Sequence, residues 1–190
     1  SDEKKITFDF VAGEMSDDEV VDMKTTKNLR WVAKLGSQAY GNVTIGNGCV
    51  FVGTNNESPR DPGKKGDRGV VMCLDEKSGE LKWQLVIPKL GAGKVSDWEY
   101  IGICSSTAID GDKVYVVTNR CEVVCLDIHG LTNGNDGPFK DEASYIKPKG
   151  MSDALNEKLD ADILWMYDMR DELGVFPHNV TSSSPVIIGD

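Results

Sequence analysis

One sequence pattern occurs twice in this chain and begins a third time. Residues 41–54, GNVTIGNGCVFVGT, align without a gap with residues 105–118, SSTAIDGDKVYVVT. Residues 183–190, SSPVIIGD, match the opening of the same pattern. Internal repeats stack against copies of themselves, so this self-similarity constrains the architecture before any single site is considered. Because the third copy is only begun, we expect the sequence to stop in the middle of a unit.

Each copy is followed by a second shared run and is closed by a tryptophan. The runs are VMCLD at 71–75 and VVCLD at 123–127, and the tryptophans are Trp83 and Trp165. In the second copy a long insertion, 128–160, separates the run from its tryptophan. Repeat proteins keep their scaffold and vary such loops, so the insertion is compatible with two copies of one unit.

Side chains alternate within each copy in the manner of β-strands, and β-branched residues dominate. The pairs Asn47-Gly48 and Gly111-Asp112 separate neighbouring runs, as tight hairpin turns require. The expected strands are 42–46, 48–54, 69–75 and 80–87 in the first unit, and 105–110, 113–118, 121–127 and 162–168 in the second. Four antiparallel strands per unit are typical of a propeller blade. We therefore predict an all-β fold, a partial β-propeller of two full four-stranded antiparallel blades plus flanking strands.

The repeats also suggest how the chain is divided. Residues 1–24 are expected to be an N-terminal extension, and residues 25–190 an incomplete propeller. Blade one spans about 41–87, blade two about 105–168, and a third begins at 182–190. Two blades cannot close a ring, since closure takes about four or more. We expect the working protein to be longer, or other chains to complete the ring.

The segment that closes the first unit, CLDEKSGELKW at 73–83, resembles the tryptophan-docking motif A-x-D-x-x-x-G-x-x-x-W of the PQQ-like, or quinoprotein-type, β-propeller repeat family. Residues 28–35, NLRWVAKL, look like the outer strand of a unit whose other strands are missing. The resemblance implies that the aspartate and glycine shape a tight turn and that the tryptophan lies against the neighbouring blade. The docking residues implied in this way are Trp31, Asp75, Gly79, Trp83, Asp127 and Trp165.

Members of this family fall into two functional groups. Some are alcohol or sugar dehydrogenases that use pyrroloquinoline quinone (PQQ) with calcium, and others are scaffold proteins without a cofactor. The dehydrogenases carry adjacent cysteines over the quinone, and this sequence has no Cys-Cys pair. The resemblance favours a non-catalytic binding or scaffolding propeller, periplasmic or secreted in a bacterium, with no cofactor predicted for this segment. The alternative is part of a quinoprotein-like oxidoreductase, with PQQ and calcium bound only in the complete protein.

The charge and hydropathy of the chain limit the classes of partner that it is expected to bind. The formal net charge is -10, and no basic cluster is dense enough to neutralise a nucleic-acid backbone. No run of about 18 apolar residues is present, so no membrane span is predicted. The expected partners are a small molecule or a protein, besides further blades from the same chain or other chains.

Ligand-binding candidates follow from the predicted architecture. In a propeller, the loops that join second to third strands and the loops that join blades lie on one face. Polar and aromatic side chains gathered there suit a small ligand; the candidates are Arg60, Trp98, Arg120, His178 and Asn179. A weaker alternative is carbohydrate binding through Trp98, Tyr100 and Tyr145. The competing interpretation is an ordinary solvated loop surface whose polar groups cap the loops.

The cysteines and acidic loops leave further alternatives open. Cys104 just precedes an innermost strand, and Cys121 just follows the turn out of its neighbour. Antiparallel pairing brings these ends close, so the pair is predicted either to form a disulfide, which would indicate an oxidising compartment, or to remain as free thiols. The segment 133–137, NGNDG, is reminiscent of a calcium loop but lacks the spaced ligands of an EF-hand. No metal site is predicted.

Overall fold

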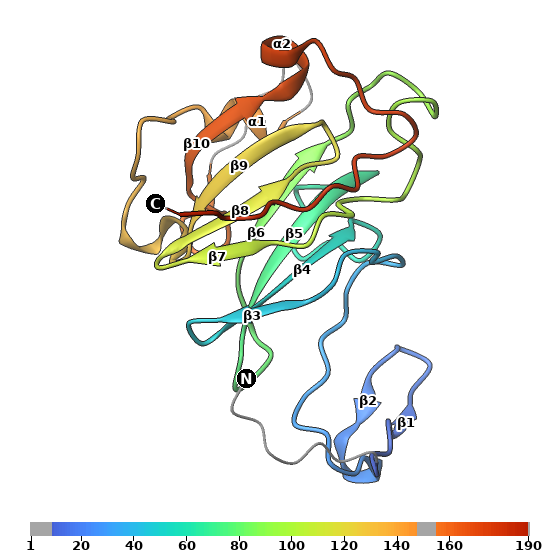
Figure 1. Cartoon of the computed structure of the whole chain (residues 1–190). Helices are drawn as coiled ribbons and strands as arrows, with labels where there is room; N and C mark the ends of the chain where they lie inside the picture. The colour runs from blue at the N-terminus through green and yellow to red at the C-terminus, as the bar shows by residue number, and fades with distance from the viewer. Residues whose placement is uncertain (1–8, 148–154, 190) are drawn as a thin grey trace.

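The computed structural model describes residues 9–147 and 155–189, which form a mostly β structure with three antiparallel sheets (Figure 1). The strands are β1 Glu14–Met15, β2 Val21–Asp22, β3 Thr44–Gly46, β4 Cys49–Asn55, β5 Arg68–Asp75, β6 Leu81–Pro88, β7 Ala108–Asp110, β8 Lys113–Val117, β9 Glu122–Asp127 and β10 Ile163–Asp168. The helices are η1 Met23–Thr25, η2 Gly130–Asn133, α1 Glu142–Tyr145 and α2 Met169–Leu173. Within the described residues, no helix has the length and apolarity needed to cross a membrane. The predicted all-β class is confirmed, and none of the described sheets closes on itself.

Both four-stranded sheets are antiparallel meanders in which each strand pairs with the next along the chain. The first sheet runs β3-β4-β5-β6, and the second runs β7-β8-β9-β10. Asn47 and Gly48, which join β3 to β4, both have positive φ, as the predicted tight hairpin requires. Every predicted strand of the two units is present, and its ends differ from the prediction by three residues or fewer.

Equivalent residues of the two units form matching cross-strand rows. In the first sheet, Phe51 on β4 lies opposite Cys73 on β5, which lies opposite Trp83 on β6. The corresponding residues of the second sheet are Tyr115, Cys125 and Trp165. We call the face of a sheet that carries this row its front face and the opposite face its back face.

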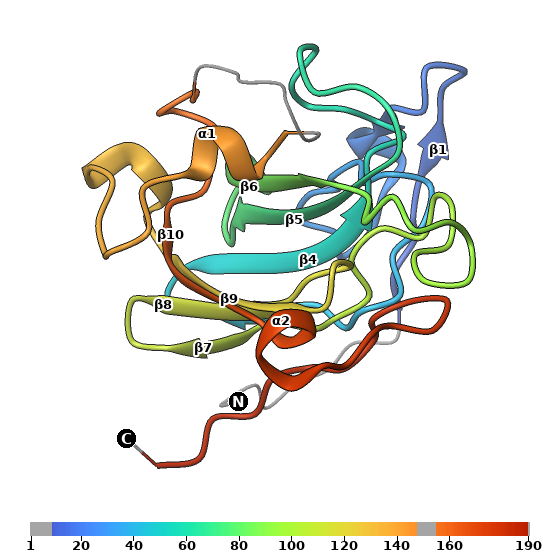
Figure 2. The ribbon, with the colours of Figure 1, turned by 90° about the horizontal axis from the view of Figure 1, so that it is seen from above.

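The main core lies between the front face of the first sheet and the back face of the second (Figure 2). Trp83 is 1% exposed, and its ring centroid lies 5.8 Å from that of Phe51. The second sheet contributes Val114, Val116, Val124, Leu126 and Ile163 to this core. Because aromatic side chains bury large apolar areas, this interface is the main source of stability between the two units.

Two tryptophans dock on the unit that follows them in the same manner. The Trp83 indole N–H donates to the carbonyl of Ile128, the first residue after β9, at 2.8 Å. The Trp31 indole N–H donates to the carbonyl of Glu76, the first residue after β5, at 3.0 Å. In both contacts the acceptor lies 45 residues beyond the tryptophan. The contact between successive units therefore repeats along the chain.

The aspartates of the docking motif shape the turns that receive these tryptophans. The Asp75 carboxylate accepts hydrogen bonds from the backbone N–H groups of Lys77 and Ser78, both at 2.9 Å. These bonds hold the pKa of Asp75 below its ordinary value. The Asp127 carboxylate accepts from the backbone N–H of His129 at 2.7 Å. Both aspartates lie where the sequence motif predicts them, in the turn after the third strand.

Residues 28–35 do not form the predicted outer strand, because no described strand pairs with them. The segment instead lies against the back face of the first sheet. Trp31, Ala33 and Leu35 pack there against a second apolar cluster, Val50, Val52, Val70, Met72, Leu74 and Val86. The segment thus keeps the packing of a preceding unit without the backbone pairing of a strand.

The innermost segments are linked by a hydrogen bond that also repeats. The backbone N–H of Asn42 donates to the hydroxyl of Ser106 at 2.8 Å. The backbone N–H of Ser106 in turn donates to the hydroxyl of Ser184 at 3.0 Å. These three residues occupy one position of the sequence repeat. Residues 182–189 are not assigned as a strand. Their hydrogen bond to the second unit nevertheless matches the one between the second unit and the first.

The front face of the second sheet carries no further sheet among the described residues. Trp165, the counterpart of Trp83, is 38% exposed, and Tyr167 beside it is also exposed. The Trp165 ring lies beside Tyr115 of its own sheet, with ring centroids 6.0 Å apart. Among the described residues, the Trp165 indole has no docking hydrogen bond like those of Trp31 and Trp83.

The insertion of the second unit returns to the first unit. The backbone N–H of Gln84 on β6 donates to the carbonyl of Leu159 at 2.7 Å, and that of Ala161 donates to the Gln84 carbonyl at 3.0 Å. Lys64, from the loop between β4 and β5, forms a buried ion pair with Asp160. These contacts fasten the insertion across the outer strand of the first sheet.

The docking motif makes a testable prediction about its glycine. Gly79 has φ +75°, and a Cβ there would lie 2.5 Å from the Trp31 ring. Gly48 has φ +74°, but nothing lies within 4 Å of its Cβ position. We expect Gly48→Ala to cost about 1 kcal/mol of unfolding free energy, from backbone strain alone. Gly79→Ala should cost about 2–4 kcal/mol, because the clash with Trp31 adds to that strain. Urea unfolding of both variants measures the difference, and equal losses would show that Trp31 does not dock on this turn.

Candidate functional site

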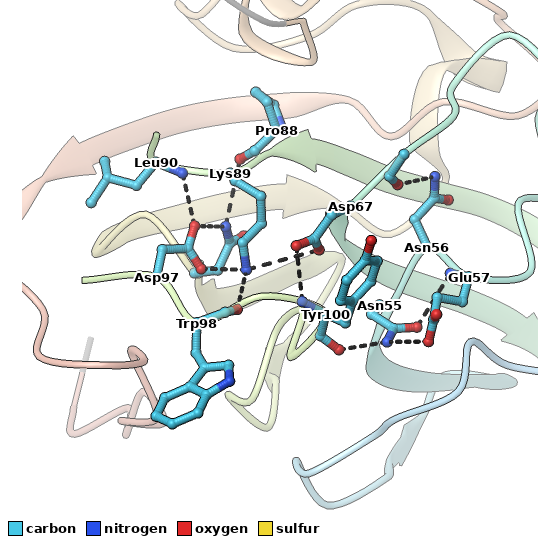
Figure 3. Close-up of polar contacts among 12 residues, drawn as sticks. Asn55, Asn56, Glu57, Asp67, Pro88, Lys89, Leu90, Asp97, Trp98 and Tyr100 are labelled. Carbon is cyan, nitrogen blue, oxygen red and sulfur yellow. Dashed lines mark hydrogen bonds and ion pairs between the residues drawn. The ribbon is translucent and has the colours of Figure 1, made fainter. Parts of the chain in front are cut away.

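Loops from both units meet at the end of the sheets where β4, β6, β8 and β10 terminate. We call this surface the loop face; its segments are 56–67, 89–107, 118–121 and 169–182. Figure 3 shows polar contacts that join the first two segments. The grouping of these loops agrees with the arrangement expected from the sequence.

A buried carboxylate organises the centre of the loop face. Asp97 accepts from the ammonium of Lys89 at 2.5 Å, from the backbone N–H of Leu90 at 2.7 Å and from the side-chain amide of Asn119 at 3.0 Å (Figure 3). Lys89 also donates to the carbonyl of Trp98 at 2.7 Å. The charges of this group neutralise one another, so its main effect is to hold the loop 89–100 in place.

A second set of contacts fixes the end of that loop. The Asp67 carboxylate accepts from the backbone N–H of Tyr100 at 2.9 Å and lies 4.0 Å from the Lys89 ammonium. The Asn55 side-chain amide donates to the Tyr100 carbonyl at 2.5 Å. Tyr100 has φ 58°, a left-handed conformation that is costly for a bulky residue. The polar contacts on both sides of Tyr100 maintain this conformation.

Trp98 lies at the junction of two loop-face segments. Its backbone N–H donates to the carbonyl of Asn179 at 2.7 Å, and the Asn179 N–H donates to the carbonyl of Val95 at 2.5 Å. The side chains of Trp98 and Tyr100 are both exposed. A rigid loop thus presents two aromatic side chains to solvent, an arrangement suited to stacking against a ligand.

Arg120 is engaged in a buried network at the edge of the loop face. Its Nε lies 3.1 Å from Glu122 Oε1, and its guanidinium lies 5.3 Å from the centre of the Tyr145 ring. Arg170 Nη2 lies 3.2 Å from the same oxygen, and the hydroxyls of Tyr145 and Thr118 donate to Oε2 at 2.6 and 3.0 Å. Burial raises the pKa of Glu122, although both arginines oppose this effect. The buried Tyr145 is not free to bind a carbohydrate, which corrects that part of the sequence interpretation.

The predicted ligand residues are only partly brought together. Trp98 and Asn179 are in contact, and the exposed His178 precedes Asn179. Arg120 is held in the network described above. Arg60 donates to the backbone carbonyl of Lys34, in the segment before β3. Both arginines are thus engaged by contacts within the chain.

A small apolar cavity lies at the inner edge of the loop face. Its volume is about 340 Å³, and it is lined by Tyr40, Ile101, Cys104, Val180 and Ser182. Tyr40, Cys104 and Ser182 precede the innermost segments of their units and occupy one position of the repeat. Successive copies of one repeat position thus supply three of the lining residues.

Of the two alternatives predicted for Cys104 and Cys121, the structure has free thiols and not a disulfide. Cys104 and Cys121 are both free and buried. The Cys121 thiol lies near the hydroxyl of Thr181, whereas the Cys104 thiol lies near Lys89 and Asp97. Burial is the largest influence on both thiols and raises their pKa values. The two thiols thus have separate surroundings, and they give no argument for an oxidising compartment.

The sequence interpretation did not single out Lys89. Its position directly after Pro88 at the end of β6 is the available signal, because a proline commonly ends a strand and fixes the direction of the residue that follows. Its partners Asp67 and Asp97 lie 22 and 8 positions away along the chain. Such pairing between loops depends on the fold and not on the repeat.

Comparison with known proteins provides no family assignment. No model of a protein family matches the chain, and a search of curated proteins found no matching sequence. The repeat, its docking contacts and the loop face therefore remain the basis for a proposed function.

Proposed function

We propose that this chain is part of a PQQ-like propeller scaffold that acts as a non-catalytic binding or scaffolding module. The observation that carries the proposal is the repeated docking contact. Trp31 and Trp83 each donate an indole hydrogen bond to the turn of the following unit, with the same spacing of 45 residues. The serine hydrogen bonds between innermost segments repeat in the same way. Two kinds of contact therefore repeat between units, one made by the tryptophans and one made between the innermost segments. This repetition supports a ring-forming arrangement.

The composition of the loop face favours binding over catalysis. Its charged groups, the buried Asp97 and the partly buried Lys89 and Asp67, are paired with one another and with backbone groups. Groups engaged in this way hold the loops in place, whereas a catalytic acid or base must be positioned to reach a substrate proton. What the loop face offers instead is a fixed platform with exposed Trp98 and Tyr100. A location outside the cytoplasm is part of the proposal and is supported by the family resemblance alone.

The front face of the second sheet is proposed to receive a further unit. It presents Trp165 and Tyr167 in an exposed row at the repeat positions that are buried in the first sheet. The next unit would come from the same chain or from another chain that completes the ring. Its turn would accept a hydrogen bond from the Trp165 indole, as Glu76 and Ile128 do for their tryptophans.

Self-association of the 190-residue chain tests this docking proposal. An uncovered aromatic sheet face is adhesive, so sedimentation velocity should show concentration-dependent association of the unmodified chain. Trp165→Lys should shift the chain to monomer, because a charge is placed in the exposed aromatic row of the front face. Trp98→Lys is the matched control on the loop face and should associate like the parent. A parent chain that stays monomeric over the whole concentration series would contradict an adhesive front face.

A second measurement distinguishes the enzymatic alternative from the scaffold proposal. PQQ and calcium are added to the complete protein, and the quinone absorbance and dye-linked oxidation of alcohols and sugars are followed. We expect no bound quinone and no turnover. Stoichiometric quinone together with turnover would replace the scaffold proposal by a quinoprotein-like oxidoreductase.

A further inference from the structure

Three carboxylates from separate parts of the second unit converge beside its insertion. Asp127 ends β9, Asp136 lies in the insertion, and Asp162 immediately precedes β10. One carboxylate oxygen of each lies within 4.8 Å of the others. The backbone keeps this arrangement: the Asp127 N–H donates to the Asp162 carbonyl at 3.0 Å, and the Asp136 N–H donates to Asp162 Oδ2 at 2.8 Å. The cluster is therefore built on an adjacent strand pair and one anchored loop.

Two buried carboxylate oxygens at this place have no hydrogen-bond donor in the part of the chain that the structure describes. Asp162 is fully buried, and its Oδ1 has no partner among the described residues. Glu142, at the start of α1, is also fully buried, and its Oε1 is likewise without a donor. The pKa of Asp162 is raised to about 6. Burial is the largest cause, and the negative charges of Glu142, Asp127 and Asp136 act in the same direction. An unpaired buried carboxylate is costly, and a cation would satisfy it.

We propose that Asp127, Asp136 and Asp162 bind a calcium ion. All the donors are oxygen atoms, which suit a hard divalent cation, and the carboxylates come from a loop as well as from strand ends. Asp136 is exposed, which leaves room for the water ligands that complete a calcium shell. Asn133, whose side-chain nitrogen lies 3.3 Å from Asp127 and 3.4 Å from Asp136, presents an oxygen when its amide rotates.

The ion would fasten the insertion to the second sheet. Asp127 and Asp162 belong to the paired ends of β9 and β10, whereas Asp136 lies on the loop that follows η2. Without a cation, the like charges of these carboxylates oppose this approach. The site would thus make the position of the insertion dependent on calcium. This role is separate from any quinone-bound calcium and does not depend on the proposed function.

Isothermal titration and thermal unfolding of the 190-residue chain with calcium chloride test the site. We expect one bound calcium per chain and a rise in Tm of roughly 5–10 °C when calcium is at about 100 times its Kd. Asp136→Asn should weaken binding at least about tenfold, because a charged ligand is lost. Asp141→Asn is the matched control: Asp141 is exposed in the same insertion, and its side chain does not cap α1. Its calcium affinity and Tm shift should equal those of the parent.

A second variant keeps the test decisive if Asp136→Asn changes the loop. Asp162→Asn removes the buried charge, so it should raise Tm in EDTA and abolish the response to calcium. No binding by the parent, or equal Tm shifts in Asp136→Asn and Asp141→Asn, would overturn the site. Equal shifts with magnesium, or with sodium chloride at matched ionic strength, would also overturn it, because they would indicate general screening of the net charge.

Discussion

Trp83→Ala is expected to lower the free energy of unfolding by about 3–5 kcal/mol, the range for truncating a buried aromatic residue. Trp83 is 1% exposed at the centre of the interface between the two sheets. The variant leaves a cavity there and also leaves the carbonyl of Ile128 without its indole donor. Equilibrium unfolding in urea, followed by circular dichroism, measures the loss.

Trp165→Ala is the matched control for this prediction. The two tryptophans occupy the same repeat position, but Trp165 is 38% exposed, and its ring lies beside Tyr115 of its own sheet. We expect its replacement to cost about 1 kcal/mol or less in the monomeric chain. Similar losses for the two variants would contradict the assignment of Trp83 as docked and Trp165 as undocked.

Lys64→Met is the second change with a large expected effect, a loss of about 3–5 kcal/mol. The side chains of Lys64 and Asp160 are 4% and 3% exposed, and they join the β4–β5 loop to the insertion. The variant leaves the Asp160 carboxylate buried without its cation, and a buried charge without a partner is strongly destabilising. Methionine keeps most of the lysine volume, so the loss reports on charge more than on packing.

A double variant and an exposed pair control this experiment. Lys64→Met/Asp160→Leu should recover most of the lost stability, because both members of the pair become apolar. Lys27→Met breaks the exposed pair with Asp9, whose side chains are 55% and 69% exposed, and should cost less than about 1 kcal/mol. Urea unfolding at neutral pH compares the three variants. A double variant as unstable as Lys64→Met would show that the ion pair is not what joins the two segments.

The sequence predicted those parts of the fold that repetition determines. Alternation and turn pairs located all eight strands of the two units, and the shared run located the turns at Asp75 and Asp127. The motif also identified the docking of Trp83. Residues 28–35 were the exception, because a strand requires a paired neighbour and alternation alone does not supply one.

Contacts between non-repeating segments were not predictable in this way. Lys64 and Asp160 are 96 residues apart, in the long loop of one unit and the insertion of the other. Asp136 was noticed within a loop reminiscent of a calcium site, but its grouping with Asp162 depends on how the insertion folds back. The sequence likewise left open whether Cys104 and Cys121 form a disulfide, and they remain free because their side chains enter different surroundings.

Hydrogen exchange of the four indole N–H groups, measured by NMR on the monomeric chain, tests the repeated docking most directly. The Trp83 indole should exchange slowest, because it is buried and bonded to the Ile128 carbonyl. Trp31 should follow, since its indole is bonded to Glu76 in a more exposed setting. Trp98 and Trp165 should exchange fastest, because both side chains are exposed. A Trp83 indole that exchanges as fast as that of Trp165 would contradict docking of successive units through their tryptophans.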